Sequence, residues 1–133
     1  MDFNNQICNR PTNKFEFIDQ FLIEFKKKKK FEYIIYDDLA ISRTSFNKYF
    51  KSIAKNQLAS RELCMRFIVR FNKYFNQDVH YIYSLFGYSA YYDWEKFALK
   101  QANEKIDYDI ILYNLVRVYK KDLYKEGKNE KKS

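Results

Sequence analysis

Residues 33–51, YIIYDDLAISRTSFNKYFK, decide the fold that we expect for this chain. The first half of the stretch carries apolar residues at roughly helical spacing, namely Ile35, Leu39 and Ile41. Asp37 and Asp38 point away from that apolar side. A turn at residues 40–42 then leads into a second helix, which Ser42 can cap because its hydroxyl accepts a hydrogen bond from a free backbone N–H. The stretch therefore predicts two short helices joined by a tight turn.

The second predicted helix, from Arg43 onward, has one aromatic side and one polar side. We expect it to bury Phe46 and Tyr49, with Phe50 at the flank. The other side is formed by polar residues, which are Arg43, Thr44, Asn47, Lys48 and Lys51. Side chains of these types can pair with base edges or phosphates when a helix lies in the major groove of DNA. The pattern favours a DNA-binding helix.

This stretch resembles the helix-turn-helix of the Cro and phage-repressor proteins, often called the Xre family. Residues 17–30, FIDQFLIEFKKKKK, are similar to the first helix of that family, which usually ends in a basic cluster. Residues 75–85, FNQDVHYIYSL, are similar to its closing segment. The resemblance covers about residues 13–88 and implies a compact five-helix DNA-binding domain.

The chain departs from the family pattern at four positions. Tyr36 stands where the family prefers a small residue, and Ala40 stands where its turn prefers glycine. Phe50 and Ser52 occupy the positions of the acidic residue and the glycine that often close the recognition helix. Because of these departures, the angle between the two helices of the motif does not follow from the resemblance.

The resemblance also implies roles for individual residues. Base contacts would come from the start of the recognition helix and from one turn later, which are here Arg43, Thr44 and Lys48, with Asn47 as a weaker candidate. Ser42 would lie near phosphate, because the free N–H groups of a helix start favour an anion. Further phosphate contacts would come from lysines, which are Lys51, Lys55, Lys26, Lys27, Lys28, Lys29 and Lys30. A lysine run is, alternatively, a solvated helix end that the helix dipole favours.

Composition agrees with a helical protein that binds a polyanion. The chain has 133 residues and a formal net charge of +8, which favours nucleic acid or an anionic membrane as a partner. The alternative is a basic protein with no such partner. Two glycines and one proline argue against hairpin-rich β architecture. Aromatic residues make up 20% of the chain, so we expect a core of Phe and Tyr side chains.

Three more helices complete the expected DNA-binding domain of residues 13–88. The first begins at Thr12 or Asn13, with an apolar face of Phe15, Ile18, Leu22 and Phe25. Ser60 would cap a helix over residues 61–75, whose apolar stripe is Leu63, Phe67, Ile68, Phe71 and Phe75. Asp78 would cap the last helix, which carries Val79, Ile82, Leu85 and Phe86 and stops at Gly87.

The regions outside this domain have separate predictions. Residues 1–12 are expected to be a loose arm and residues 126–133 a disordered tail. Residues 89–105 and 107–125 are expected to form a pair of helices. The second helix has a wide apolar surface, and we predict a homodimer interface from Ile111, Leu112, Leu115, Val116, Tyr119 and Leu123. The alternative is that one stripe of this helix packs on Trp94 and Phe97 and the other on the five-helix core.

Several classes of function are disfavoured. No glycine loop for phosphates and no Ser/His/Asp or Cys/His set is present, so we expect no enzyme activity and no cofactor. Cys8 and Cys64 are too few and too far apart for a zinc site, and they fit a reducing compartment. The chain lacks a membrane-spanning run and a signal-peptide segment, so a cytoplasmic location is expected.

We therefore expect sequence-specific binding to double-stranded DNA at an inverted repeat, most simply as a transcriptional repressor of a phage, plasmid or other mobile element. A related role would be as an accessory factor in DNA transfer or excision. The alternative from another class is a helix-turn-helix scaffold that binds proteins, such as a phage-encoded inhibitor of a bacterial defence system of the anti-CRISPR kind. RNA binding would instead require aromatic rings on an exposed surface.

Overall fold

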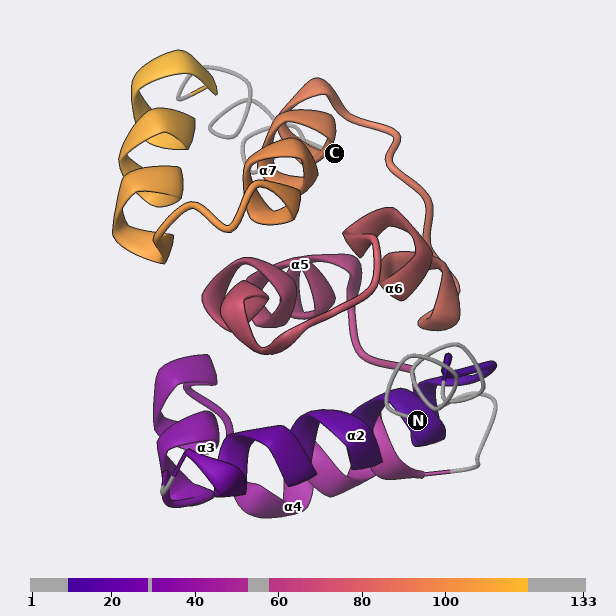
Figure 1. The fold of residues 1–133 in the computed structure, drawn as a ribbon. Helices are drawn as coiled ribbons and strands as arrows, with labels where there is room; N and C mark the ends of the chain where they lie inside the picture. The colour runs from indigo at the N-terminus through magenta and orange to yellow at the C-terminus, as the bar shows by residue number, and fades with distance from the viewer. Residues whose placement is uncertain (1–9, 29, 53–57, 120–133) are drawn as a thin grey trace, which may run out of the picture.

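The computed structural model describes residues 10–28, 30–52 and 58–119, and every regular element in these ranges is a helix (Figure 1). In chain order the elements are α2 (Lys14–Lys27), α3 (Tyr33–Leu39), α4 (Arg43–Phe46), the π-helical η1 (Asn47–Lys51), α5 (Arg61–Arg70), the 3-10 turn η2 (Asn72–Tyr74), α6 (Val79–Leu85) and α7 (Asp93–Asn103). Residues 108–119 form a further helix. The prediction of an all-α protein is confirmed for the described residues. None of their helices is long and apolar enough to cross a bilayer.

Four helices begin at side-chain caps that the sequence predicts. Each cap accepts a backbone hydrogen bond at 2.7–3.1 Å, and the four are Asn13 before α2, Ser42 before α4, Ser60 before α5 and Asp78 before α6. The bonds form because the first N–H groups of a helix have no partner within it. At the other end of α6, Gly87 has φ of 92°, a conformation that glycine adopts at little cost. The predicted stop of this helix is confirmed.

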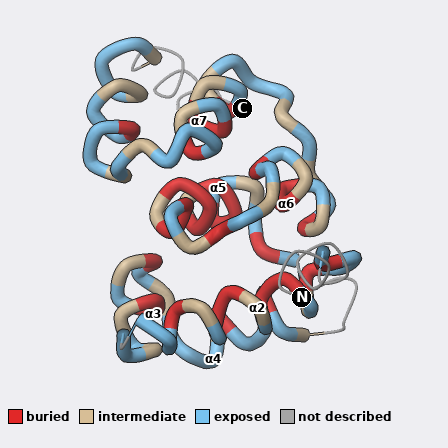
Figure 2. Tube along the Cα trace, viewed as in Figure 1, coloured by how far each residue is buried: buried red, intermediate tan, exposed pale blue. Residues whose placement is uncertain are grey.

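Helix α5 is the centre of the molecule. In Figure 1, α2, α3 and α4 lie on one side of it, α6 lies beside it, and α7 with the helix of residues 108–119 lies on the other side. Figure 2 shows that most of α5 is buried, and its buried residues are Leu63, Cys64, Met65, Phe67, Ile68 and Val69. A helix with such a wide buried face requires neighbours on more than one side.

The core is built from aromatic rings, as the composition predicts. Phe67 is fully buried, and its ring centroid lies 4.9–6.3 Å from those of Phe17, Phe21, Phe50, Phe71, Phe75 and Phe86. Edge-to-face and tilted pairs at such distances add to the stabilisation from burial. Residues from α2, η1, α5 and the segments after α5 and α6 therefore meet at one ring.

The buried face of α2 differs in part from the predicted one. Ile18, Leu22 and Phe25 are buried as expected, but Phe15 is only half-buried. Phe17 and Phe21 take the central positions against α5. The predicted residues form only one edge of the apolar stripe of α2. The observed stripe also includes Phe17 and Phe21, each one position before a predicted residue, and is therefore wide enough to cover α5.

Helix α7 begins at Asp93 rather than near Ser89, which corrects the predicted range of 89–105. The carboxylate of Glu95 accepts hydrogen bonds from the backbone N–H groups of Tyr91 and Tyr92, at 2.8 and 3.0 Å. These bonds hold the preceding segment outside the helix. A glutamate in the first turn that bonds back to the cap residue is a recurrent helix-start motif.

Glu95 also joins three helices, because it is fully buried between them. Arg61 of α5 donates to both of its carboxylate oxygens, at 2.6 and 2.8 Å, and the Tyr83 hydroxyl of α6 donates to one of them. Burial alone would raise the pKa of Glu95, but the hydrogen bonds from Tyr83, Tyr92, Arg61 and Tyr91 outweigh burial and lower it. This cluster is a polar joint between α5, α6 and α7.

A second polar joint lies at the far end of α7. Lys105, with φ of 62°, donates from its ammonium group to the carbonyls of Asn72 and Phe75, at 2.8 and 2.5 Å. The buried amide of Asn72 donates to the carbonyl of Ile106 at 2.8 Å. The backbone after α5 is thereby fastened to the backbone after α7.

The helix of residues 108–119 is only partly covered. Ile111 is fully buried in the core, so the prediction that it belongs to an interface is wrong. Leu115 is half-buried against the core, and the ring of Tyr119 packs on that of Phe97 with centroids 5.5 Å apart. Large apolar side chains remain exposed around the helix, namely Ile110, Leu112, Tyr113, Val116 and Val118. Leu123 lies outside the described residues.

The turn between α3 and α4 is closed by an alanine in a left-handed conformation. Ala40 has φ of 56° and ψ of 42°, and the N–H of Ile41 donates to the carbonyl of Tyr36 at 3.1 Å. An alanine Cβ in this region costs about 1–2 kcal/mol, which glycine avoids. The chain therefore makes this left-handed turn with a residue that is less suited to it than glycine.

Replacing Ala40 by glycine should stabilise the protein by up to about 1 kcal/mol, since the lost strain exceeds the added backbone entropy of the unfolded chain. Ala40 is exposed, so no packing is removed. The unfolding midpoint in denaturant should rise for Ala40→Gly and fall for Ala40→Val, whose branched Cβ increases the strain. A lower midpoint for the glycine variant would contradict the left-handed turn.

Candidate nucleic-acid interface

The polar side of the segment from Ser42 to Lys51 faces solvent. The residues with predicted roles on it are all exposed, namely Ser42, Arg43, Thr44, Asn47, Lys48 and Lys51. On the opposite side Phe46 and Phe50 are fully buried. The structure thus brings together the predicted base-contacting residues and two of the predicted phosphate-contacting ones. Lys55 lies outside the described residues.

A π-turn changes which aromatic residues of this segment are buried. Phe50 is fully buried and stacks on Phe46 with ring centroids 4.9 Å apart, whereas Tyr49 is only half-buried. The prediction that Tyr49 is core and Phe50 a flank is therefore wrong. The reason is that α4 continues as η1, whose wider turn keeps Phe50 on the side of Phe46 and rotates Tyr49 away from it. Tyr49 instead lies under the ammonium group of Lys48, 5.5 Å from its ring centroid.

The end of η1 is anchored to the start of α2 by a buried lysine. Lys14 is 7% exposed, and its ammonium group donates to the carbonyl of Tyr49 at 3.1 Å. Burial lowers the pKa of Lys14, although a nearby thiol, that of Cys64, opposes this shift. A cation beside the last carbonyls of a helix satisfies them and complements the helix dipole. Lys14 was not among the predicted site residues, and its only local signal is a lysine in a first helical turn, where acids are favoured.

The start of α3 is tied to the end of α2 through Glu32. Its carboxylate accepts from the hydroxyl of Tyr36 and lies 3.4 Å from the ammonium group of Lys26. The hydrogen bond from Tyr36, the contact with Lys26 and the charge of Lys51 lower the pKa of Glu32, against burial, which raises it. Burial, followed by the bond to Glu32, raises the pKa of Tyr36 to about 12, and the charge of Arg43 opposes this. Lys26, Arg43 and Lys51 therefore belong to one electrostatic neighbourhood.

The lysine run has local partners for part of its charge. Lys26, Lys27, Lys28 and Lys30 are exposed, and Lys29 lies outside the described residues. Lys26 pairs with Glu32, Lys27 pairs with Glu24 at 3.3 Å, and Lys28 lies over the ring of Tyr74. Ion pairs at such exposed positions are weak, so these lysines can exchange their partners for phosphates.

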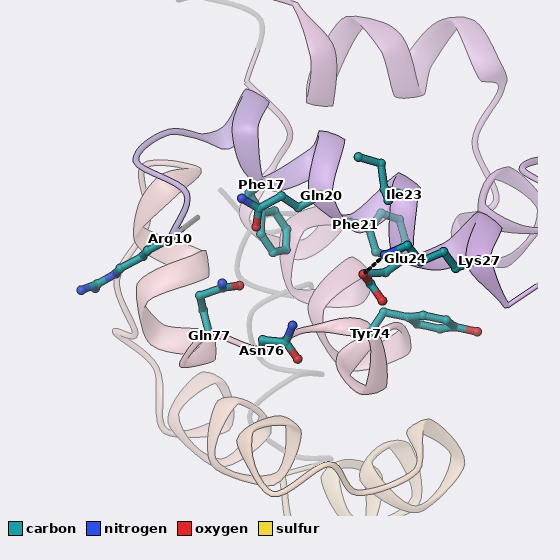
Figure 3. Close-up of a pocket in the computed structure, with 10 residues that line it drawn as sticks. All are labelled: Arg10, Phe17, Gln20, Phe21, Ile23, Glu24, Lys27, Tyr74, Asn76 and Gln77. Carbon is teal, nitrogen blue, oxygen red and sulfur yellow. Dashed lines mark hydrogen bonds and ion pairs between the residues drawn. The ribbon is translucent and has the colours of Figure 1, made fainter. Parts of the chain in front are cut away.

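A groove of about 850 Å³ lies between α2 and the segment after η2 (Figure 3). Phe17 and Phe21 form its floor, and the side-chain amides of Gln20, Asn76 and Gln77 lie around it. Its charged residues are Arg10, Glu24 and Lys27, and the last two are joined by a hydrogen bond. Apart from these charges, the polar groups that line the groove are amides and the hydroxyl of Tyr74, none of which is a strong acid, base or nucleophile at neutral pH.

Comparison with known proteins gives no family for this chain. No protein-family model matches it, and neither a curated protein nor a solved structure matches it significantly.

Proposed function

We propose that this chain is a helix-turn-helix DNA-binding protein with the five-helix arrangement of the Cro and phage-repressor class, formed by α2 to α6. Its recognition element is the segment from Ser42 to Lys51, and its ligand is double-stranded DNA of defined sequence. The role that we propose is transcriptional repression or regulation in a phage, plasmid or other mobile element.

One observation carries this proposal. Five polar and basic side chains are exposed along α4 and η1, directly opposite the fully buried rings of Phe46 and Phe50. A capped helix that is fixed by a buried face and presents Arg, Thr, Asn and Lys outward has the chemistry that the major groove requires. The formal net charge of +8 supplies the non-specific attraction to phosphate.

Within this proposal the residues have distinct tasks. Arg43 can hold guanine through two hydrogen bonds, to O6 and N7, and Thr44, Asn47 and Lys48 supply further base contacts. Lys48 is a point charge and so selects geometry less well than an arginine. Ser42 and Lys51 contact phosphate, together with the exposed lysines at the end of α2.

The proposal is tested by selecting bound duplexes from a random double-stranded pool with the full chain. We expect enrichment of one sequence, arranged as an inverted repeat, and a shift of that duplex in a gel. Enrichment without any sequence preference would leave only non-specific binding. An absence of binding even at low salt would favour the protein-binding alternative.

We further propose that the chain acts as a homodimer, as an inverted repeat requires two half-sites. The support is the exposed apolar surface of the helix of residues 108–119. Leu112 and Val116 lie one turn apart on it and are 44% and 45% exposed. Contiguous apolar surface of this kind marks interaction sites more often than ordinary protein surface.

Replacing Leu112 and Val116 by glutamate should convert the dimer into a monomer, because two charges would have to be buried in the interface. Sedimentation velocity should give a dimer for the wild type and a monomer for the variant, with equal helix content by circular dichroism. The variant should lose affinity for the inverted repeat and keep its weak binding to random DNA. A wild type that stays monomeric at high concentration would remove the dimer.

The same exposed surface is the observation that favours a protein-binding role as the second candidate. In that case Leu112→Glu with Val116→Glu would abolish capture of a protein partner while Arg43→Ala would not. If the protein reads DNA, Arg43→Ala should abolish the preference for the cognate duplex. If it binds a protein, Arg43→Ala should leave binding of that partner unchanged.

A further inference from the structure

Two aromatic rings lie on the surface where the chain enters α3, namely Phe31 just before the helix and Tyr33 at its first position. Phe31 is 69% exposed and Tyr33 is 59% exposed. Their rings stack on each other, with centroids 6.0 Å apart and planes 19° from parallel. The outer ring faces are therefore open to a ligand. Neither residue was assigned a role by the sequence pattern.

Positive charge surrounds this pair. Lys30 immediately precedes Phe31 and is exposed, as are Lys26, Lys27 and Lys28 at the end of α2. Glu32, which separates the two residues in the sequence, is bound by Lys26 and Tyr36, so its negative charge is partly neutralised. The charge of Lys51 also acts on Glu32, which places the end of the recognition segment in the same neighbourhood.

We propose that Phe31 and Tyr33 form a stacking platform for unpaired bases of single-stranded nucleic acid, with Lys30 and the exposed lysines of α2 binding the adjacent phosphates. Proteins that bind single strands without strong sequence preference combine these two features, aromatic faces for bases and a basic surface for the backbone. The proposal goes beyond duplex recognition by Arg43 and does not depend on it.

The chemistry favours single strands over the other polyanions. In a duplex the faces of the bases are covered by their neighbours, and only unpaired bases can stack on a side chain. A membrane surface would require a broad apolar face, whereas this site offers two rings within a segment that also contains Glu32 and Asp37. Beside the duplex-contacting segment, such a platform would hold a strand that is melted or unpaired next to the operator.

The experiment compares two ligands that differ only in their bases. Fluorescence anisotropy of the full chain is measured with a labelled oligo(dT) and with an abasic strand of the same length and charge. We expect the wild type to bind oligo(dT) at least about fivefold more tightly, since stacking contributes through each base. Phe31→Ala with Tyr33→Ala should abolish this preference and leave the abasic affinity unchanged. Lys27→Ala with Lys30→Ala should weaken both ligands alike.

The controls separate stacking from loss of fold. Both rings are exposed, so the double variant should keep the wild-type unfolding midpoint. Tyr91→Ala removes a ring that is 72% exposed on the segment leading into α7, and it should keep the preference for oligo(dT). Equal wild-type affinity for the two strands, or a preference that survives in the double variant, would overturn the proposal. Loss of binding to anionic vesicles without loss of the oligo(dT) preference would assign the rings to a membrane and overturn it equally.

Discussion

Replacing Glu95 by glutamine should destabilise the protein by about 1–3 kcal/mol at neutral pH, because buried donors would lose an acceptor and Arg61, whose side chain is 33% exposed, would lose its charged partner. The carboxylate accepts from Arg61, Tyr83 and two backbone N–H groups, and a neutral amide cannot accept all of these bonds. The loss should appear in equilibrium unfolding as a lower midpoint with an unchanged denaturant dependence. Glu62→Gln is the matched control on α5. Glu62 is exposed and its nearest contact with Arg66 is 3.9 Å, so that variant should differ from the wild type by less than about 0.5 kcal/mol.

The effect of Glu95 should also depend on pH. Its pKa is lowered in the folded protein, so the carboxylate contributes stability that is fully present above the unfolded pKa of about 4.3. That stability is lost as the pH falls through the lower, folded pKa. The difference in unfolding free energy between the wild type and Glu95→Gln should therefore shrink below about pH 4. A difference that is small at pH 7, or that does not change with pH, would contradict the buried charged cluster.

Removing the ring of Phe46 or Phe50 should destabilise the protein by about 3–5 kcal/mol, since both are fully buried and each leaves a cavity. Phe50 is the more informative of the two. Positions 46 and 50 share a side in a regular α-helix as well, and the wider π-turn of η1 rotates Tyr49 away from that side. Phe50→Ala should therefore cost much more than Tyr49→Ala, for which we expect about 1 kcal/mol.

Unfolding of Phe50→Ala and Tyr49→Ala in denaturant compares the burial of the two rings directly. Equal losses, or a larger loss for Tyr49→Ala, would mean that Phe50 is not the buried ring of this segment. In that case the positions of Lys48 and Lys51 relative to Arg43 would also change, because they are fixed by the same turn.

Local features of this fold could be predicted from the sequence because they depend on neighbouring residues. Ser42 and Ser60 cap helices through bonds to residues three positions later, and Gly87 ends a helix through its own backbone freedom. The exposed polar side from Arg43 to Lys51 follows from the pattern in the same way. These parts of the candidate site required no knowledge of the rest of the chain.

Features that depend on distant residues could not be predicted. Arg61 and Glu95 are 34 positions apart, and Lys14 and Tyr49 are 35 apart, so no local pattern joins them. The choice of Phe50 over Tyr49 follows from the space left by Phe67 and Phe86, whose rings both contact Phe50. Ile111 is core for a similar reason, because the packing of the last described helix decides which of its apolar stripes is covered.

The recognition role of the exposed segment is tested most directly by the ratio of the affinities for cognate and random duplexes, measured at fixed salt for three proteins. Relative to the wild type, Arg43→Ala should lower this ratio by about 5- to 150-fold, the effect of losing a two-bond contact with guanine, while random DNA binds almost as before. Lys51→Ala should weaken both duplexes alike, keep the ratio, and reduce the salt dependence by about one unit for one lost phosphate contact. A ratio for Arg43→Ala equal to that of the wild type would show that this helix does not contact the bases.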